Sequence, residues 1–167
     1  KNYEKYAGLR FENAAITTEG GNATMPIKRV PLSEVEAMEH ACAGEPDPGM
    51  CRYAIGVGTL KDDDKSHYIL KEKGVVEMVR CLTLPELLDA HAVSTIDLFQ
   101  VDAEGFDGEI LLQLDLARYR PSIIQIECDH LPVPLLRTVI DSLHAAGYRM
   151  RSYGGDLLAV TPDLDHL

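Results

Sequence analysis

The chain has 167 residues and a formal net charge of −11, from 27 Asp and Glu against 16 Lys and Arg. This length suits one domain with a sizeable core, which we take as residues 1–167. An acidic surface repels phosphate groups, so we expect no nucleic-acid partner and no membrane partner. No apolar run approaches the roughly 20 residues that cross a bilayer. The four cysteines show no CxxC spacing, which favours a reducing, cytoplasmic location.

The N-terminal part predicts two short strands and then a long irregular segment. Residues 8–16 ("GLRFENAAI") predict a strand, and the "TTEGG" that follows predicts a turn. Residues 23–30 predict a second strand, which Pro26 confines to the edge of a sheet. From 31 to 73 the pattern is weak, so we expect an excursion from the sheet within the same domain.

Strands recur at regular intervals after this segment. The apolar patterns of 74–84, 96–101 and 122–128 each predict a strand. Two further strands are expected around Gly154-Gly155, a pair that is typical of a hairpin turn. Strands that alternate with helices favour an α/β fold with a mostly parallel sheet, here closed by a C-terminal antiparallel hairpin.

The helices between these strands begin and end at recognisable residues. Thr83 is a good N-cap for the helix "LPELLDAH". Apolar residues at helical spacing follow Gly105: Phe106, Ile110, Leu111 and Leu114. The segment 132–147 has an apolar helical face and ends at Gly147, a typical stop for a helix.

Ionisable side chains follow two of the predicted strands, at the point where each strand ends. Asp102 and Glu104 come after the strand 96–101, and Glu127 and His130 come at the end of the strand 122–128. Gly105 permits a tight turn between the first pair and the next helix. Ligands of open parallel sheets bind just beyond the carboxyl ends of the strands. If the two strands are neighbours, these side chains converge on one candidate site.

A purely structural interpretation also fits part of this pattern. Acidic residues are favoured in the first turn of a helix, which suits Asp107 and Glu109 and also covers Glu104. It explains Glu127 less well, because a carboxylate within an otherwise apolar strand is costly without a partner. His130, just before "LPVP", suits a surface or capping residue as well as a catalytic base.

The stretch "IDLFQVDAEGFDGEILLQLDLARYRPSIIQIECDHL" resembles the core of the FkbM family of methyltransferases. The shared features are an apolar strand that ends in D-x-E-G, a helix with "EIL", an "RP" pair and a strand that ends in glutamate. "CLTLPELLDAH", "GYRMRSYGGDLLAV" and "NYEKYAGLRFENAAIT" resemble flanking segments of the same family. The resemblance covers most of the chain and is weakest across 31–73.

This resemblance implies a Rossmann-like fold, S-adenosylmethionine as cofactor, and O-methylation of a hydroxyl on a small molecule, sugar or polyketide. It places Asp102 beside the reacting methyl group, and it makes Asp102 and Glu104 candidates for the base or for positioning the acceptor. Glu127 is then a contact to the acceptor or to these groups, and His130 an alternative base. Asn13 and Ala14 match the position where this type of fold meets the adenine, although an ordinary strand end fits them equally.

One expected feature of the family is missing from the sequence. The cofactor site of the family begins with a glycine-rich strand-to-helix turn, followed by an acidic residue for the ribose. The glycine-rich "GVGTL" (56–60) is followed by "KDDDK" rather than an apolar helix, so it predicts a bend. We therefore expect the C-terminal two-thirds of a domain, without its first strands and inactive on its own. Exposed sheet edges would then favour a homodimer.

Two other functions fit the acidic strand ends. In the first, oxygen ligands from Asp102, Glu104 and Glu127 hold a divalent cation in a metal-dependent hydrolase or phosphotransferase. That class needs a nucleophile or a phosphate-binding turn, and the sequence offers no convincing candidate. In the second, the chain is a non-catalytic α/β module that dimerises.

Overall fold

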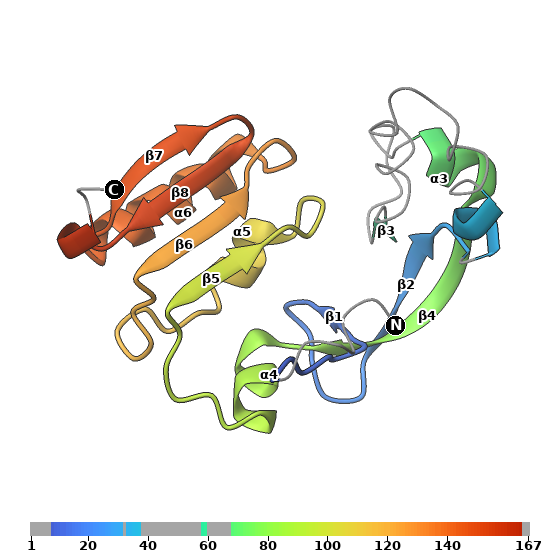
Figure 1. Cartoon of the computed structure of the whole chain (residues 1–167), viewed down its shortest axis with the longest axis horizontal. Coiled ribbons are helices and arrows are strands. Elements are labelled where there is room, and N and C mark those ends of the chain that lie inside the picture. Colours follow the sequence, from blue (N-terminus) through green and yellow to red (C-terminus); the bar gives the residue numbers. More distant parts are fainter. Residues whose placement is uncertain (1–7, 32, 38–57, 60–67, 165–167) are drawn as a thin grey trace.

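The computed structural model describes residues 8–31, 33–37, 58–59 and 68–164. Within these residues the strands form two four-stranded sheets (Figure 1). In spatial order, the first sheet contains β1 (Ala15–Ile16), β4 (Val75–Leu82), β2 (Thr24–Arg29) and β3 (Gly58–Thr59). The second contains β5 (Leu98–Val101), β6 (Ile123–Glu127), β8 (Asp156–Val160) and β7 (Arg149–Tyr153).

The first sheet is built around the long strand β4, as the alternation in 74–84 predicts. β1 is parallel to β4, and β2 is antiparallel to it. The strand predicted over 8–16 is only two residues long, because the residues before it bury no face against the sheet: Leu9 is 51 % and Phe11 64 % exposed. The order places β2 between β4 and β3, so the expectation of an edge strand is wrong. Pro26 is tolerated because, in the described residues, β3 pairs only with Lys28 and Arg29 and Pro26 has β4 alone as neighbour.

The second sheet contains the predicted strand–helix–strand unit and the predicted hairpin. β5 is parallel to β6, while β8 is antiparallel to both β6 and β7. The turn between β7 and β8 uses Gly154, whose φ of +60° is a conformation that suits glycine. Across the described residues two strand pairs are parallel and four are antiparallel, so the expectation of a mostly parallel sheet is wrong for this part. The difference arises because β2 and β8 are each antiparallel to both of their neighbours.

Two helices lie behind the second sheet in Figure 1, α5 (Asp107–Leu111) and α6 (Val133–Ala145). Gly108 lets them approach closely, since a Cβ at this position would lie 3.0 Å from Leu135. α6 stops before Gly147, which has a φ of +83°, as the sequence predicts. The fully buried side chains between helices and sheet include Ile124, Ile126, Val139, Leu143 and Ala159.

α4 (Leu84–Ala90) follows β4 directly and begins with a capping box. The Thr83 hydroxyl accepts a hydrogen bond from the Glu86 backbone N–H, and the Glu86 carboxylate accepts one from the Thr83 N–H. The same carboxylate also accepts a hydrogen bond from the Gly21 N–H, at 2.8 Å. Glu86 therefore ties the loop after β1 to the start of α4.

We expect Thr83→Ala to lower the free energy of unfolding by about 1 kcal/mol, because it removes the oxygen that caps α4. Urea denaturation measures this change. Thr138→Ala is the matched control, since its exposed hydroxyl donates a hydrogen bond to the Pro134 carbonyl within α6. The control should stay within about 0.5 kcal/mol of the wild type. Equal losses for both variants would contradict the assigned role of the cap.

The excursion predicted over 31–73 is described only in part. Residues 33–37 are helical, and α3 (Tyr68–Lys73) leads into β4. Of the "GVGTL" segment, Gly58 and Thr59 form β3, and the other residues lie outside the described ranges, as does "KDDDK". A 3-10 turn, Pro162–Leu164, ends the described chain. None of the described helices has the length and apolar character needed to span a membrane.

Candidate active site

The loop after β5 has an unusual backbone conformation at Glu104. Glu104 has a φ of +50° and Gly105 a φ of +99°, so a non-glycine residue occupies the left-handed region. The Asp107 carboxylate, which is completely buried, accepts hydrogen bonds from the backbone N–H groups of Ala103 and Gly105, each at 3.1 Å. These two N–H groups lie on either side of Glu104. The Asp107 carboxylate therefore fixes the loop through these two hydrogen bonds.

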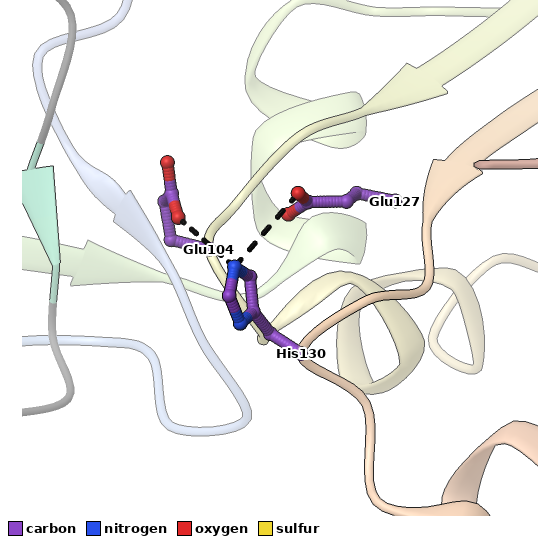
Figure 2. Close-up of side chains that lie close together, drawn as sticks. All are labelled: Glu104, Glu127 and His130. Carbon is purple, nitrogen blue, oxygen red and sulfur yellow. Dashed lines mark ion pairs between the residues drawn. The ribbon is translucent and has the colours of Figure 1, made fainter. Parts of the chain in front are cut away.

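Glu127 and His130 come to this loop from the neighbouring strand. Glu127 is the last residue of β6, and His130 lies in the turn between β6 and α6. His130 Nε2 lies 3.8 Å from Glu104 Oε2 and 3.9 Å from Glu127 Oε1, as Figure 2 shows. The parallel pairing of β5 with β6 produces this arrangement, because it brings both strand ends to one edge. We call Glu104, Glu127 and His130 the acidic trio.

Burial changes the ionisation of Glu127. Its side chain is 24 % exposed, and its Oε2 atom is buried without a hydrogen-bond partner among the described residues. Desolvation raises the pKa of Glu127 above its usual value of 4.5. The nearby charge of His130 lowers this pKa, whereas Glu104 and Asp102 raise it further. Glu127 therefore keeps its proton to a higher pH than an exposed glutamate does.

This raised pKa predicts how stability depends on pH. Below 4.5 both the folded and the unfolded state hold the proton, so Glu127 costs nothing. As the pH rises through the window between 4.5 and the folded-state pKa, only the folded state retains the proton, and stability is lost. We expect Glu127→Gln to unfold at higher urea concentration than the wild type at about pH 7, with a smaller difference at about pH 4. A difference that is constant with pH would contradict the assigned burial.

A pocket of about 590 Å³ opens beside the loop, a size suited to a small-molecule ligand. β1, β2, α4, β5 and α5 all contribute to its walls. Its polar groups, Gln100, Asp102 and Glu104, come from β5 and the loop after it, and the other lining residues are apolar. They are Ala15, Ile16, Ile27, Leu84, Leu87, Phe99, Val101, Ala103, Phe106 and Ile110.

The family model of the methyltransferase FkbM domain matches residues 12–150. This range runs from just before β1 into β7 and includes both the pocket and the acidic trio. The chain belongs to the FkbM methyltransferase family. Searches of the curated proteins and of the solved structures found no significant match.

The FkbM domain brings three of the four predicted catalytic residues into one cluster. Glu104 and Glu127 each lie within ion-pair distance of His130. Asp102 is exposed at the pocket wall rather than in that cluster. Glu104 belongs to both the acidic trio and the pocket. It therefore links the ionisable cluster to the cavity.

The two residues predicted to meet the adenine are placed differently from the expectation. Asn13 and Ala14 precede β1 instead of forming its end, and neither lines the pocket. Ala15 and Ile16 line it in their place. The shift follows from the shortness of β1. A contact of Asn13 and Ala14 with the cofactor stays a prediction.

The sequence interpretation missed Asp107 as a site residue, because an acidic residue in the first turn of a helix usually acts on that helix. Its carboxylate instead accepts hydrogen bonds from the loop that precedes the helix. The detectable signal is the spacing in "DAEGFD", which places an Asp two residues after a glycine turn.

The acidic trio also has the donors of a metal site. Glu104, Glu127 and His130 each offer one ligand atom, and these atoms all lie within 4.8 Å of one another. Two carboxylate oxygens and one imidazole nitrogen suit divalent cations such as Mn²⁺ or Zn²⁺.

Proposed function

We propose that this FkbM domain transfers a methyl group from S-adenosylmethionine to a hydroxyl oxygen of a small molecule, such as a sugar or a polyketide. The observation that carries the proposal is the position of Glu104. It lines the pocket and lies within ion-pair distance of His130, which also pairs with Glu127. A carboxylate is thereby available at the wall of a cavity large enough for a small molecule.

The pocket fits the methyl donor in its chemistry. Its apolar walls from Ile16, Leu84 and Phe99 suit an adenosyl group. Asp102 and Glu104 place negative charge at one wall, which favours a positively charged sulfonium nearby. When bound, S-adenosylmethionine supplies an electrophilic methyl group on a positively charged sulfur.

The residues of the chain act on the acceptor and its proton. In the overall reaction an O–CH₃ bond forms, the S–CH₃ bond breaks with its electron pair left on sulfur, and the hydroxyl proton leaves. We assign that proton to the Glu104 carboxylate, which acts as general base. Asp102, exposed on the same loop, orients the hydroxyl for in-line attack. His130, within ion-pair distance of both Glu104 and Glu127, orients the Glu104 carboxylate.

A binding experiment on the intact protein tests this proposal. Calorimetry should detect S-adenosylmethionine, and Ala15→Phe, which fills the pocket from β1, should weaken its affinity at least tenfold, about 1.4 kcal/mol. Ala117→Phe, at an exposed position, is the control with the same added ring and should bind like the wild type. Full binding by a folded Ala15→Phe would overturn the proposal.

A second candidate function is metal-dependent hydrolysis or phosphoryl transfer, and the donor set of the acidic trio favours it. Titration with Mn²⁺ separates the two candidates. Tight Mn²⁺ binding that Glu127→Gln abolishes, together with no affinity for S-adenosylmethionine, would select the hydrolase or phosphotransferase.

We further propose that the order β5-β6-β8-β7 is part of a Rossmann-like methyltransferase sheet. The support is the parallel β5–β6 pair with a helix between its strands, followed by an antiparallel hairpin. A homodimer and a cytoplasmic location stay predictions from the sequence.

A further inference from the structure

Asp107 is a completely buried carboxylate, and among the described residues it accepts hydrogen bonds from two backbone N–H groups of the preceding loop. A buried charge is costly unless hydrogen bonds compensate for its lost hydration. The N–H groups of Ala103 and Gly105 provide two such charge-assisted bonds. The carboxylate therefore holds the loop in one conformation.

The direction of these bonds distinguishes Asp107 from an ordinary helix cap. Asp115 shows the ordinary pattern, because its carboxylate accepts from the N–H groups of Ala117 and Arg118, which follow it. Asp107 bonds to residues that precede it by four and two positions. It thus restrains the loop that carries Glu104.

The restrained residue is the one whose position matters for the site. A non-glycine residue at a φ of +50° costs about 1–3 kcal/mol unless its surroundings impose that conformation. The two N–H groups bonded by Asp107 flank Glu104, so they fix the backbone on both of its sides. Its side chain then lies 3.8 Å from His130 (Figure 2).

We propose that Asp107 is a positioning residue, which holds Glu104 in its left-handed conformation and thereby directs the Glu104 carboxylate at His130 and the pocket. The relevance of this role to catalysis rests on the proposed function. The structural claim itself is testable without any methyl donor or acceptor, so the two fail separately.

The test is a double-mutant cycle that uses the titration of Glu127 as the reporter. Glu104 is one of the charges that raise the pKa of Glu127, so Glu104→Gln should lower that pKa, measured by NMR of the side-chain carboxyl carbon. Asp107→Asn removes a hydrogen-bond acceptor and displaces Glu104, which changes the same pKa. In the Glu104→Gln background, Asp107→Asn should have a clearly smaller effect, because only its own weak charge effect on Glu127 is left.

Two further variants keep the result interpretable. Asp107→Glu retains the charge but shifts the carboxylate by one methylene, and it should show the same dependence on Glu104. Asp115→Asn, the matched change at an ordinary cap, should leave the Glu127 titration unchanged in both backgrounds. Equal effects of Asp107→Asn with and without Glu104 would overturn the proposal. Loss of folding in both Asp107 variants would assign the residue a purely structural role and would also overturn it.

Discussion

Glu104→Gln should lower the kcat of methyl transfer about 10²- to 10⁴-fold, because it removes the proposed general base while keeping the size of the side chain. The affinity for S-adenosylmethionine should change little, since the loss concerns the transition state rather than the bound ground state. A panel of sugar and polyketide hydroxyls with S-adenosylmethionine labelled in its methyl group provides the measurement.

The control for this experiment is Glu36→Gln. Glu36 is an exposed glutamate in the short helical segment 33–37, outside the lining of the pocket. It should retain the wild-type kcat and KM. A wild-type kcat in Glu104→Gln, or an equal loss in both variants, would contradict the assignment of Glu104 as the base.

Ile126→Ala should lower the free energy of unfolding by about 2–5 kcal/mol, the range for deleting a large buried aliphatic side chain. Ile126 is 0 % exposed and lies in β6 next to Glu127. The cavity would form beside the end of β6, next to Glu127 of the acidic trio. Urea denaturation with a fixed m-value measures the loss.

The matched variant is Ile140→Ala on α6, where the side chain is 37 % exposed. It removes the same atoms from a partly hydrated position, so its cost should be well below that of Ile126→Ala. Equal costs at the two positions would show that β6 is not at the centre of the core, against the packing described above.

Local sequence signals predicted the second half of the chain well. The apolar runs of β5 and β6, the Thr83 cap, the stop at Gly147 and the hairpin at Gly154 each depend on interactions between residues close in sequence. The convergence of Glu104 with Glu127 was also predictable, because parallel neighbouring strands end at the same edge. That step required only the order of the elements.

Features that depend on distant or backward contacts were not predictable in the same way. The length of β1 depends on what its upstream residues bury, and the sequence carries no local signal of that. The division into two sheets depends on which distant strands pair, because β4 pairs with β1 and β2 whereas β5 pairs with β6. The proposed role of Asp107 depends on the left-handed backbone at Glu104. A glutamate gives no sign of that conformation, because glycine is the residue that adopts it routinely.

The most direct measurement of the central claim is the position of S-adenosylhomocysteine in a crystal structure of the protein. We predict that its sulfur lies in the pocket between β1 and β5, facing Asp102 and Glu104, with His130 still beside Glu104. A ligand bound on another face of the molecule, with Glu104 directed away from its sulfur, would contradict the account.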